Sequence, residues 1–205
     1  MFQISASKSI GLNVAFYFFP TALSLLWLAW AGYWIASVAY EASTNKAKET
    51  ERRVGGTGFL FLILLFVMLS PFGERGLLGW QYLFPPEALK VIGLITVTAG
   101  VTLAIWARRH LGSNWSGVPS LKKDHELITS GPYSTVRHPI YTGIMFGMVG
   151  STLVLGTIGS LVVIFLAALV VAVRVKQEEG LMMSEFGNAY SDYRKRTKAI
   201  VPWLL

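Results

Sequence analysis

An uncharged apolar run near the start of the chain sets the strongest limit on its fold. No charged residue occurs between positions 10 and 40. The apolar core of a secretory signal peptide is only about 7–15 residues long, so this run is too long to be one. About 20 apolar residues suffice to cross a bilayer as an α-helix. The sequence therefore predicts a first transmembrane helix over residues 13–39, kinked by Pro20 near one face.

Four more apolar runs follow. They occupy residues 58–72, 89–107, 139–155 and 157–173. The first of these four is shorter than a perpendicular span requires and crosses the membrane only if it begins near Val54. Only Gly156 and its neighbours separate the last two runs, which predicts a tight antiparallel hairpin. We expect an all-α integral membrane protein with about five transmembrane helices.

Composition supports this class and excludes several others. Hydrophobic residues make up 53% of the chain and charged residues 14%, against about 25% charged residues in an ordinary soluble domain. The absence of cysteine excludes disulfide scaffolds, cysteine-ligated zinc, iron–sulfur clusters and thiol nucleophiles. The 3 histidines lack the short spacing of a metal-binding helix, so no metal site is expected.

Basic residues indicate the orientation in the membrane. They gather after the first span, after the third span and in the C-terminal tail, whereas the hairpin tip has none. Because basic loops remain in the cytoplasm, we expect the N-terminus outside and the C-terminus inside. The net charge of +7 is explained by this topology, and nucleic acid is not an expected partner. Residues 108–138 and 174–205 then face the cytosol and its soluble co-substrates.

The fourth span opens with Arg137, His138 and Pro139. Proline suits the first position of a helix, so Arg137 and His138 lie at a helix N-terminus that favours an anion. The turn at residues 130–133 would bring Tyr133 toward this end. Taken alone, the motif is better explained by an arginine that anchors the helix to lipid headgroups.

Arg174, Glu178 and Glu179 follow the fifth span. Arg174 and Glu178 are four residues apart and share a helix face. They form either a surface ion pair worth about 0.3–0.5 kcal/mol, or an arginine clamp for a carboxylate or phosphate beside carboxylates that bind hydroxyls or a cation. The sequence leaves both interpretations open.

Two further patterns have structural interpretations. Gly143, Gly147 and Gly150 recur at helical spacing, which favours close packing of the hairpin against the fifth span. Residues 185–193 are typical of an amphipathic helix with its tyrosines on one face. The basic residues that follow, from Arg194 to Lys198, would meet anionic headgroups at the membrane surface.

Short motifs in the second half of the chain combine into one recognisable pattern. In order, they are Leu111-Gly112 with Trp115-Ser116, the stretch from His125 to Tyr133, the stretch from Arg137 to Gly143, Glu178-Glu179, and Glu185-Phe186-Gly187 with Tyr190, Tyr193 and Pro202. Together they resemble the isoprenylcysteine carboxyl methyltransferase and phospholipid methyltransferase superfamily of integral membrane enzymes. The resemblance covers residues 108–205. We therefore expect N-terminal transmembrane helices over 1–107 and a methyltransferase core over 108–205.

The resemblance implies that S-adenosylmethionine binds in a cytosolic region over the C-terminal helices, without a Rossmann fold. It also implies that Arg174 lies near the methyl acceptor. The cofactor-binding positions carried over are His125, Leu127, Ile128, Tyr133, His138, Tyr141 and Glu178, with Arg137 and Glu179 as further candidates.

The residues support this site independently, because the start of the fourth span and the end of the fifth meet at one end of a hairpin. A methionyl carboxylate would suit the helix N-terminus with Arg137 or His138, and a sulfonium would suit an aromatic ring. The candidate catalytic residues are Arg174 and Glu178. Arg174 would hold a carboxylate acceptor, whereas an amine, thiol or phenol would need Glu178 or Glu179 as proton acceptor.

We expect methyl transfer to a lipophilic, membrane-borne acceptor, foremost an isoprenylcysteine-type carboxylate. A phospholipid, a small thiol and a small amine remain alternative acceptors. A membrane reductase of the sterol type that uses NADPH is a second class, and a non-enzymatic membrane protein is a third. The sequence indicates neither the acceptor atom nor the oligomeric state.

Overall fold

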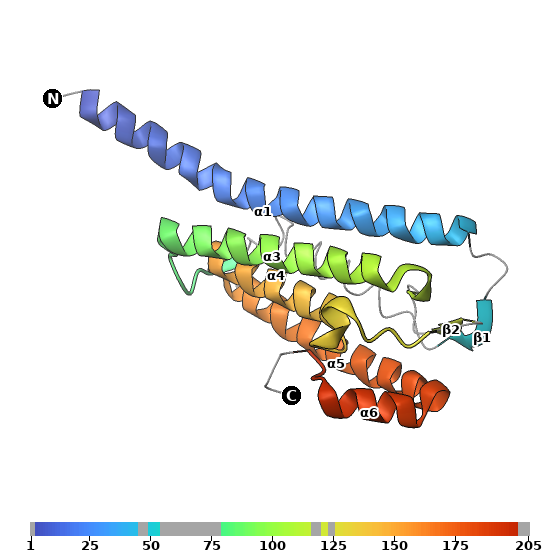
Figure 1. Cartoon of the computed structure of the whole chain (residues 1–205). Coiled ribbons are helices and arrows are strands. Elements are labelled where there is room, and N and C mark those ends of the chain that lie inside the picture. The colour runs from blue at the N-terminus through green and yellow to red at the C-terminus, as the bar shows by residue number, and fades with distance from the viewer. Residues whose placement is uncertain (1–2, 45–48, 54–78, 116–119, 123–125, 201–205) are drawn as a thin grey trace.

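The computed structural model describes residues 3–44, 49–53, 79–115, 120–122 and 126–200 (Figure 1). Five α-helices and a two-stranded sheet form its main elements. They are α1 (Gln3–Thr44), β1 (Glu49–Arg53), α3 (Glu87–Leu111), β2 (Ser120–Lys122), α4 (Pro139–Leu155), α5 (Ile158–Phe186) and α6 (Asn188–Arg196), with 3-10 turns η2 (Gly112–Asn114) and η3 (Gly131–Ser134). The predicted second span, 58–72, lies outside the described residues.

Three of these helices are long and apolar enough to cross a membrane. The candidate spans are Phe18–Tyr40 in α1, Glu87–Leu111 (α3) and Ile158–Phe186 (α5), which confirms the first, third and fifth predicted spans as apolar helices. Helix α4 has 17 residues and is therefore about 25 Å long, somewhat less than the hydrocarbon core of about 30 Å. The chain is an integral membrane protein in which α4 is shorter than the three candidate spans.

The predicted hairpin of α4 and α5 is confirmed, and its turn is short. Pro139 is the first residue of α4, as expected from its missing N–H. Gly156 ends the helix with a φ of 62°, a left-handed conformation that favours glycine. The Thr157 side chain then accepts a hydrogen bond from the Ser160 amide and caps the start of α5.

The glycines of α4 pack on α3 rather than on α5, and the prediction that they face the fifth span is wrong. A side chain at Gly143 would collide with the Gly100 carbonyl of α3, and one at Gly150 would lie 2.5 Å from the Gly93 carbonyl. The small residues of α3 explain this choice, because two glycine-bearing faces let the backbones approach closely. Helix α3 also runs antiparallel to α4 (Figure 1), with Trp27 of α1 against Gly147.

Helix α1 joins this core through aromatic side chains. Trp27 is buried and donates a hydrogen bond of 3.0 Å to Ser151 in α4. Helices α1 and α3 run in the same direction, since Lys90 near the start of α3 lies over the Phe19 ring and Trp115, just after α3, contacts Trp34 further along α1. Pro20 lies inside α1, which bends along its length in Figure 1.

The C-terminal region differs in detail from the prediction. Helix α5 continues to Phe186, and Gly187, with a φ of 49°, separates it from α6. The amphipathic helix therefore begins at Asn188 instead of Glu185. Tyr190 and Tyr193 share one face as predicted, but they are buried against the protein. The tyrosine face of α6 thus holds the helix to the bundle.

Candidate functional site

The end of the chain runs alongside the start of α4. Residues Val136 and Lys198 form a parallel bridge, and the amides of Arg137 and His138 donate to the carbonyls of Lys198 and Ala199 at 2.8 and 3.0 Å. These bonds occupy backbone donors that precede the helix. Further along, the Thr142 hydroxyl donates to the Ile200 carbonyl at 2.6 Å. Residues 197–200 therefore fix the position of the α4 N-terminus.

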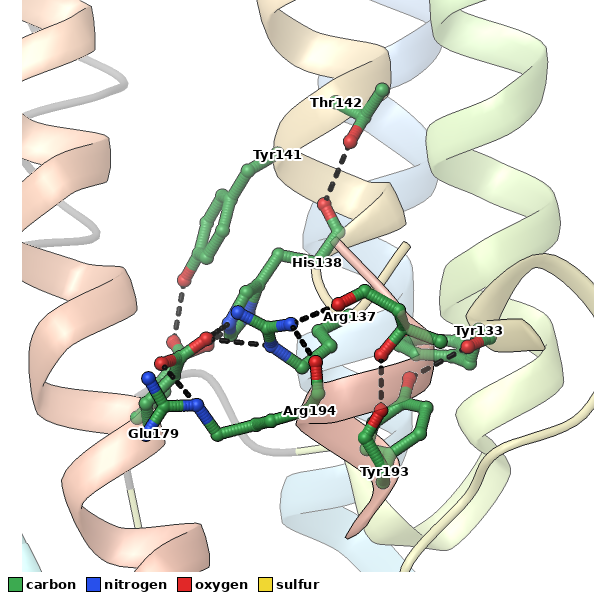
Figure 2. Close-up of polar contacts among 10 residues, drawn as sticks. Tyr133, Arg137, His138, Tyr141, Thr142, Glu179, Tyr193 and Arg194 are labelled. Carbon is green, nitrogen blue, oxygen red and sulfur yellow. Dashed lines mark hydrogen bonds and ion pairs between the residues drawn. The ribbon is translucent and has the colours of Figure 1, made fainter. Parts of the chain in front are cut away.

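Glu179 of α5 is the centre of a group of ion pairs, shown in Figure 2. Arg137 Nε lies 2.8 Å from Glu179 Oε1, and Arg194 Nε lies 3.5 Å from Glu179 Oε2. The Arg137 guanidinium also donates to the carbonyls of Arg194 and Thr197. Arg137 thus links the start of α4 with α5 and α6.

A second group joins α4 and α5 one helical turn deeper. Tyr141 donates a 2.5 Å hydrogen bond to Glu178, and Arg174 Nε donates to the Tyr141 hydroxyl at 3.0 Å. Arg174 also lies 3.3 Å from Glu178. The Arg174 side chain is 8% exposed and that of Glu178 is 25% exposed. Because the arginine is buried, the interpretation of Arg174 and Glu178 as a surface ion pair is wrong.

His138 lies between the two carboxylates. Its Nδ1 is 3.5 Å from Glu178 and its Nε2 is 3.5 Å from Glu179. Burial alone lowers the pKa of His138, but pairing with Glu178 and Glu179 outweighs burial and raises the pKa above its ordinary value. The imidazole ring also stacks on Tyr141. A protonated His138 would therefore hold the two acidic side chains in place.

Tyr133 lies at the edge of this cluster. The turn η3 is confirmed, and the carbonyl of Tyr133 accepts a hydrogen bond of 2.6 Å from Tyr193 in α6. The Tyr133 hydroxyl donates to the Ala107 carbonyl of α3 at 3.4 Å, and its ring stacks on His110. Burial, followed by the negative charge of Glu178, raises the pKa of Tyr133, so its hydroxyl stays protonated.

The structure brings most of the predicted site residues together. Arg137, His138, Tyr141, Arg174, Glu178 and Glu179 form one polar cluster at the end of the α4–α5 hairpin. Tyr133 adjoins this cluster through α6. Leu127 and Ile128 lie half-buried in the segment before η3, where Ile128 packs on the core. The predicted His125 lies outside the described residues.

Sequence reasoning missed two parts of the cluster. The sequence predicts Arg194 at the membrane surface but not its ion pair with Glu179, which the structure shows while leaving the Arg194 side chain 46% exposed. Sequence reasoning also gave no role to residues 197–200 beside Arg137 and His138. The available signal was the glycine at 187, which turns α6 back toward α4, but nothing local in the sequence gives the direction of that turn.

The cluster combines opposite charges in a way that suits a zwitterionic ligand. Three guanidinium groups face two carboxylates, so the positive charge exceeds the negative charge even before His138 is protonated. Glu178 has a partly exposed carboxylate that accepts a hydrogen bond from the Tyr141 hydroxyl, and a carboxylate suits a cation. Among the described residues, no group of three or more possible ligands would hold a metal ion.

Fold and site together define a helical integral membrane protein with a charged, largely buried cluster where one hairpin end meets the C-terminal segment. Residues 91–184 match the model of the isoprenylcysteine carboxyl methyltransferase (ICMT) family. The chain is therefore similar to that family over these residues, which make up just under half of its length. The matched segment extends from α3 to α5 and contains every ionisable group of the cluster except Arg194.

Two curated relatives differ in how much of their length is matched. A protein-S-isoprenylcysteine O-methyltransferase from Xenopus laevis is 34% identical over 119 residues, which are 57% of this chain and 41% of that protein. The nickel-cobalt-cadmium resistance protein NccN from Alcaligenes xylosoxydans xylosoxydans is 26% identical over 156 residues, which are 76% of this chain and 67% of that protein. The chain thus spans less than half of the first relative's length.

A solved structure shares the fold. It is the eukaryotic intramembrane Ras methyltransferase ICMT, which aligns with a TM-score of 0.56 and 26% sequence identity. The alignment covers 71% of this chain and 53% of that chain. The likeness confirms an ICMT-like intramembrane fold.

Proposed function

We propose that this protein transfers a methyl group from S-adenosylmethionine to a lipophilic acceptor in the membrane, foremost an isoprenylcysteine-type carboxylate. The observation that carries the proposal is the contact of Arg174 with Tyr141 and Glu178 at the membrane end of the cluster. Burying an arginine at this depth costs free energy unless its charge is paired. Arg174 is paired with Glu178 and Tyr141, which are both possible cofactor contacts. The similarity of residues 91–184 to the ICMT family supports the same reaction.

The residues of the cluster fit the cofactor by charge. Glu178, Tyr141 and His138 would hold it, with the carboxylate and ring suited to the sulfonium. The excess of guanidinium groups suits its carboxylate. S-adenosylmethionine supplies an activated methyl group, which passes to the acceptor as the carbon–sulfur bond breaks. Arg137 binds Glu179 and the carbonyls of Arg194 and Thr197, so in this proposal it positions Glu179 and the α4 N-terminus beside the cofactor.

Arg174 would hold the acceptor. A carboxylate is already ionised and needs no proton acceptor, so Arg174 has only to orient it in line with the methyl group. An amine or thiol must lose a proton, and Glu178 is then the nearest candidate base. Exclusion of water from the buried contact favours transfer over hydrolysis.

Calorimetry on detergent-purified protein tests the proposal. S-adenosylmethionine and S-adenosylhomocysteine should both bind, and NADPH should not. Labelled methyl transfer into an isoprenylcysteine analogue, a phospholipid extract and a lipophilic thiol then identifies the acceptor class. Binding of NADPH alone would assign the chain to the reductases, and binding of no nucleotide would support a non-catalytic role.

The similarity to NccN favours a second candidate, a role in resistance to divalent metal ions, because the match covers 67% of that protein. The described residues contain no metal-binding cluster, so such a role would not rest on metal binding by them. Cells that lack the protein should be complemented with wild type and with Glu178→Gln. Restored metal tolerance by both forms would support resistance without methyl transfer.

A further inference from the structure

Aromatic side chains gather at the end of the bundle opposite the polar cluster. Trp80, Tyr82 and Phe84 lie on the segment between residues 79 and 86, just before α3. They are 65%, 45% and 80% exposed. The segment 79–86 contains no charged residue. We call Trp80, Tyr82 and Phe84 the aromatic loop.

Backbone hydrogen bonds tie the aromatic loop to the α4–α5 turn. The amides of Tyr82 and Leu83 donate to the Gly156 carbonyl at 3.0 and 3.3 Å, and the Ile158 amide donates to the Trp80 carbonyl at 2.9 Å. Gln81 also forms an antiparallel bridge with Thr157. The loop is therefore attached to the tip of the hairpin at a fixed position, with its aromatic rings exposed.

The surroundings of the loop indicate what covers these rings. The loop leads into α3 and is bonded to the start of α5, and both are candidate membrane spans. The ends of such helices lie in the headgroup layer, where tryptophan and tyrosine are enriched because their rings are apolar and carry a polar atom. Tyr82 combines both features, since it is 45% exposed and its hydroxyl contacts the Thr152 carbonyl at 3.5 Å.

We propose that the aromatic loop is a lipid-interface anchor, which holds the tip of the α4–α5 hairpin in the headgroup layer of the membrane face opposite the polar cluster. Its partner is the boundary between phospholipid headgroups and acyl chains. The inference rests on the geometry of the loop and is independent of the proposed methyl transfer.

The anchor has a consequence for the depth of the cluster. Helix α4 has 17 residues, and the rise of about 1.5 Å per residue places Tyr141 roughly 20–25 Å from the turn. Arg174 lies at a similar distance along α5. A hydrocarbon core of about 30 Å therefore leaves the contact of Tyr141 with Arg174 inside the opposite boundary. The anchored turn thus sets the depth at which the polar cluster meets the bilayer.

Site-directed spin labelling tests the anchor directly, because the chain contains no cysteine. Phe84→Cys is labelled in protein reconstituted into phosphatidylcholine–phosphatidylglycerol vesicles, and its collisions with oxygen and with a water-soluble nickel chelate are measured. Phe165→Cys, seven residues after the start of α5, and Glu126→Cys, in the segment before η3, are exposed controls for the acyl region and for water. The label at position 84 should report a depth between the two controls. A depth equal to either control would overturn the proposal.

A second measurement asks whether the loop positions the hairpin. Trp80→Ser, Tyr82→Ser and Phe84→Ser are combined with the label at Phe165→Cys. Loss of the anchor should change the measured depth of position 165 in vesicles while circular dichroism shows unchanged helix content. An unchanged depth with intact helices would contradict the anchor. Should the triple variant not fold, the label at position 84 in the otherwise unchanged chain still decides the question.

Discussion

The two ends of the α4–α5 hairpin are held by different kinds of interaction. At the turn, backbone hydrogen bonds join Gly156 to the aromatic loop, and no charged side chain takes part. At the other end, the same two helices are joined by ion pairs among arginines, glutamates and His138. Backbone contacts do not change with pH and specify position only. Charged side chains can bind ligands and titrate. Mutations at the polar end should therefore change activity and pH dependence, whereas mutations at the turn should change stability and leave binding intact.

The largest expected effect concerns Arg174. Arg174→Ala removes the only buried guanidinium described at the membrane end of the cluster, so transfer to a carboxylate acceptor should fall about 10²–10³-fold, as for loss of one stabilising donor. S-adenosylhomocysteine affinity should change little, because Glu178 and Tyr141 remain. Calorimetry and methyl-transfer rates measure the two effects separately, and Arg174→Lys is the control that retains charge. Unchanged turnover in Arg174→Ala would rule out the acceptor role.

At the turn, Gly156 should affect stability and leave binding intact. A Cβ at this position would collide with the Leu83 carbonyl. Gly156→Ala should therefore lower the free energy of unfolding by about 1–3 kcal/mol, as for overpacking, beyond the cost of a positive φ. Thermal unfolding in detergent measures the loss. Gly156→Asn is the matched control, because asparagine tolerates the left-handed conformation. Recovery of stability in Gly156→Asn would show that φ alone, and no contact with the loop, requires glycine.

The same contrast explains how far the sequence predicts this protein. The hairpin follows from local signals, namely the two apolar runs, Pro139 and Gly156, and the structure confirms it. Packing partners do not follow from one helix alone. The glycine face of α4 is visible in the sequence, but its choice of α3 depends on a complementary face with Gly93 and Gly100.

The candidate site shows the same limit. Arg137, His138 and Glu178 could be placed at one hairpin end from the order of the spans. Arg194 could not, because its contact with Glu179 depends on the direction in which the chain leaves Gly187. Long-range contacts of this kind depend on tertiary packing, which local propensity does not determine.

The polar end should be sensitive to pH. Pairing with Glu178 and Glu179 raises the pKa of His138, so the stabilisation is fully present below the unfolded value of about 6.5. It is lost as pH rises through the raised folded value. Melting temperatures in detergent should therefore decline from pH 6 upward, and His138→Gln should flatten this decline. His110→Gln is the control, since His110 hydrogen-bonds Ser130 outside the carboxylate cluster. An unchanged slope in His138→Gln would show that other groups cause the dependence.

The smallest expected effect concerns α6. The Tyr193 hydroxyl donates a hydrogen bond of 2.6 Å to the Tyr133 carbonyl, and both residues are buried. Tyr193→Phe keeps the ring and removes this bond, so it should cost about 1 kcal/mol of unfolding free energy. Because Tyr133 lies at the edge of the cluster, S-adenosylhomocysteine affinity should weaken slightly in parallel, whereas the depth of a label on the aromatic loop should stay the same. A shift in that depth would show that the two ends of the hairpin are coupled, and that α6 helps to set the position of the protein in the bilayer.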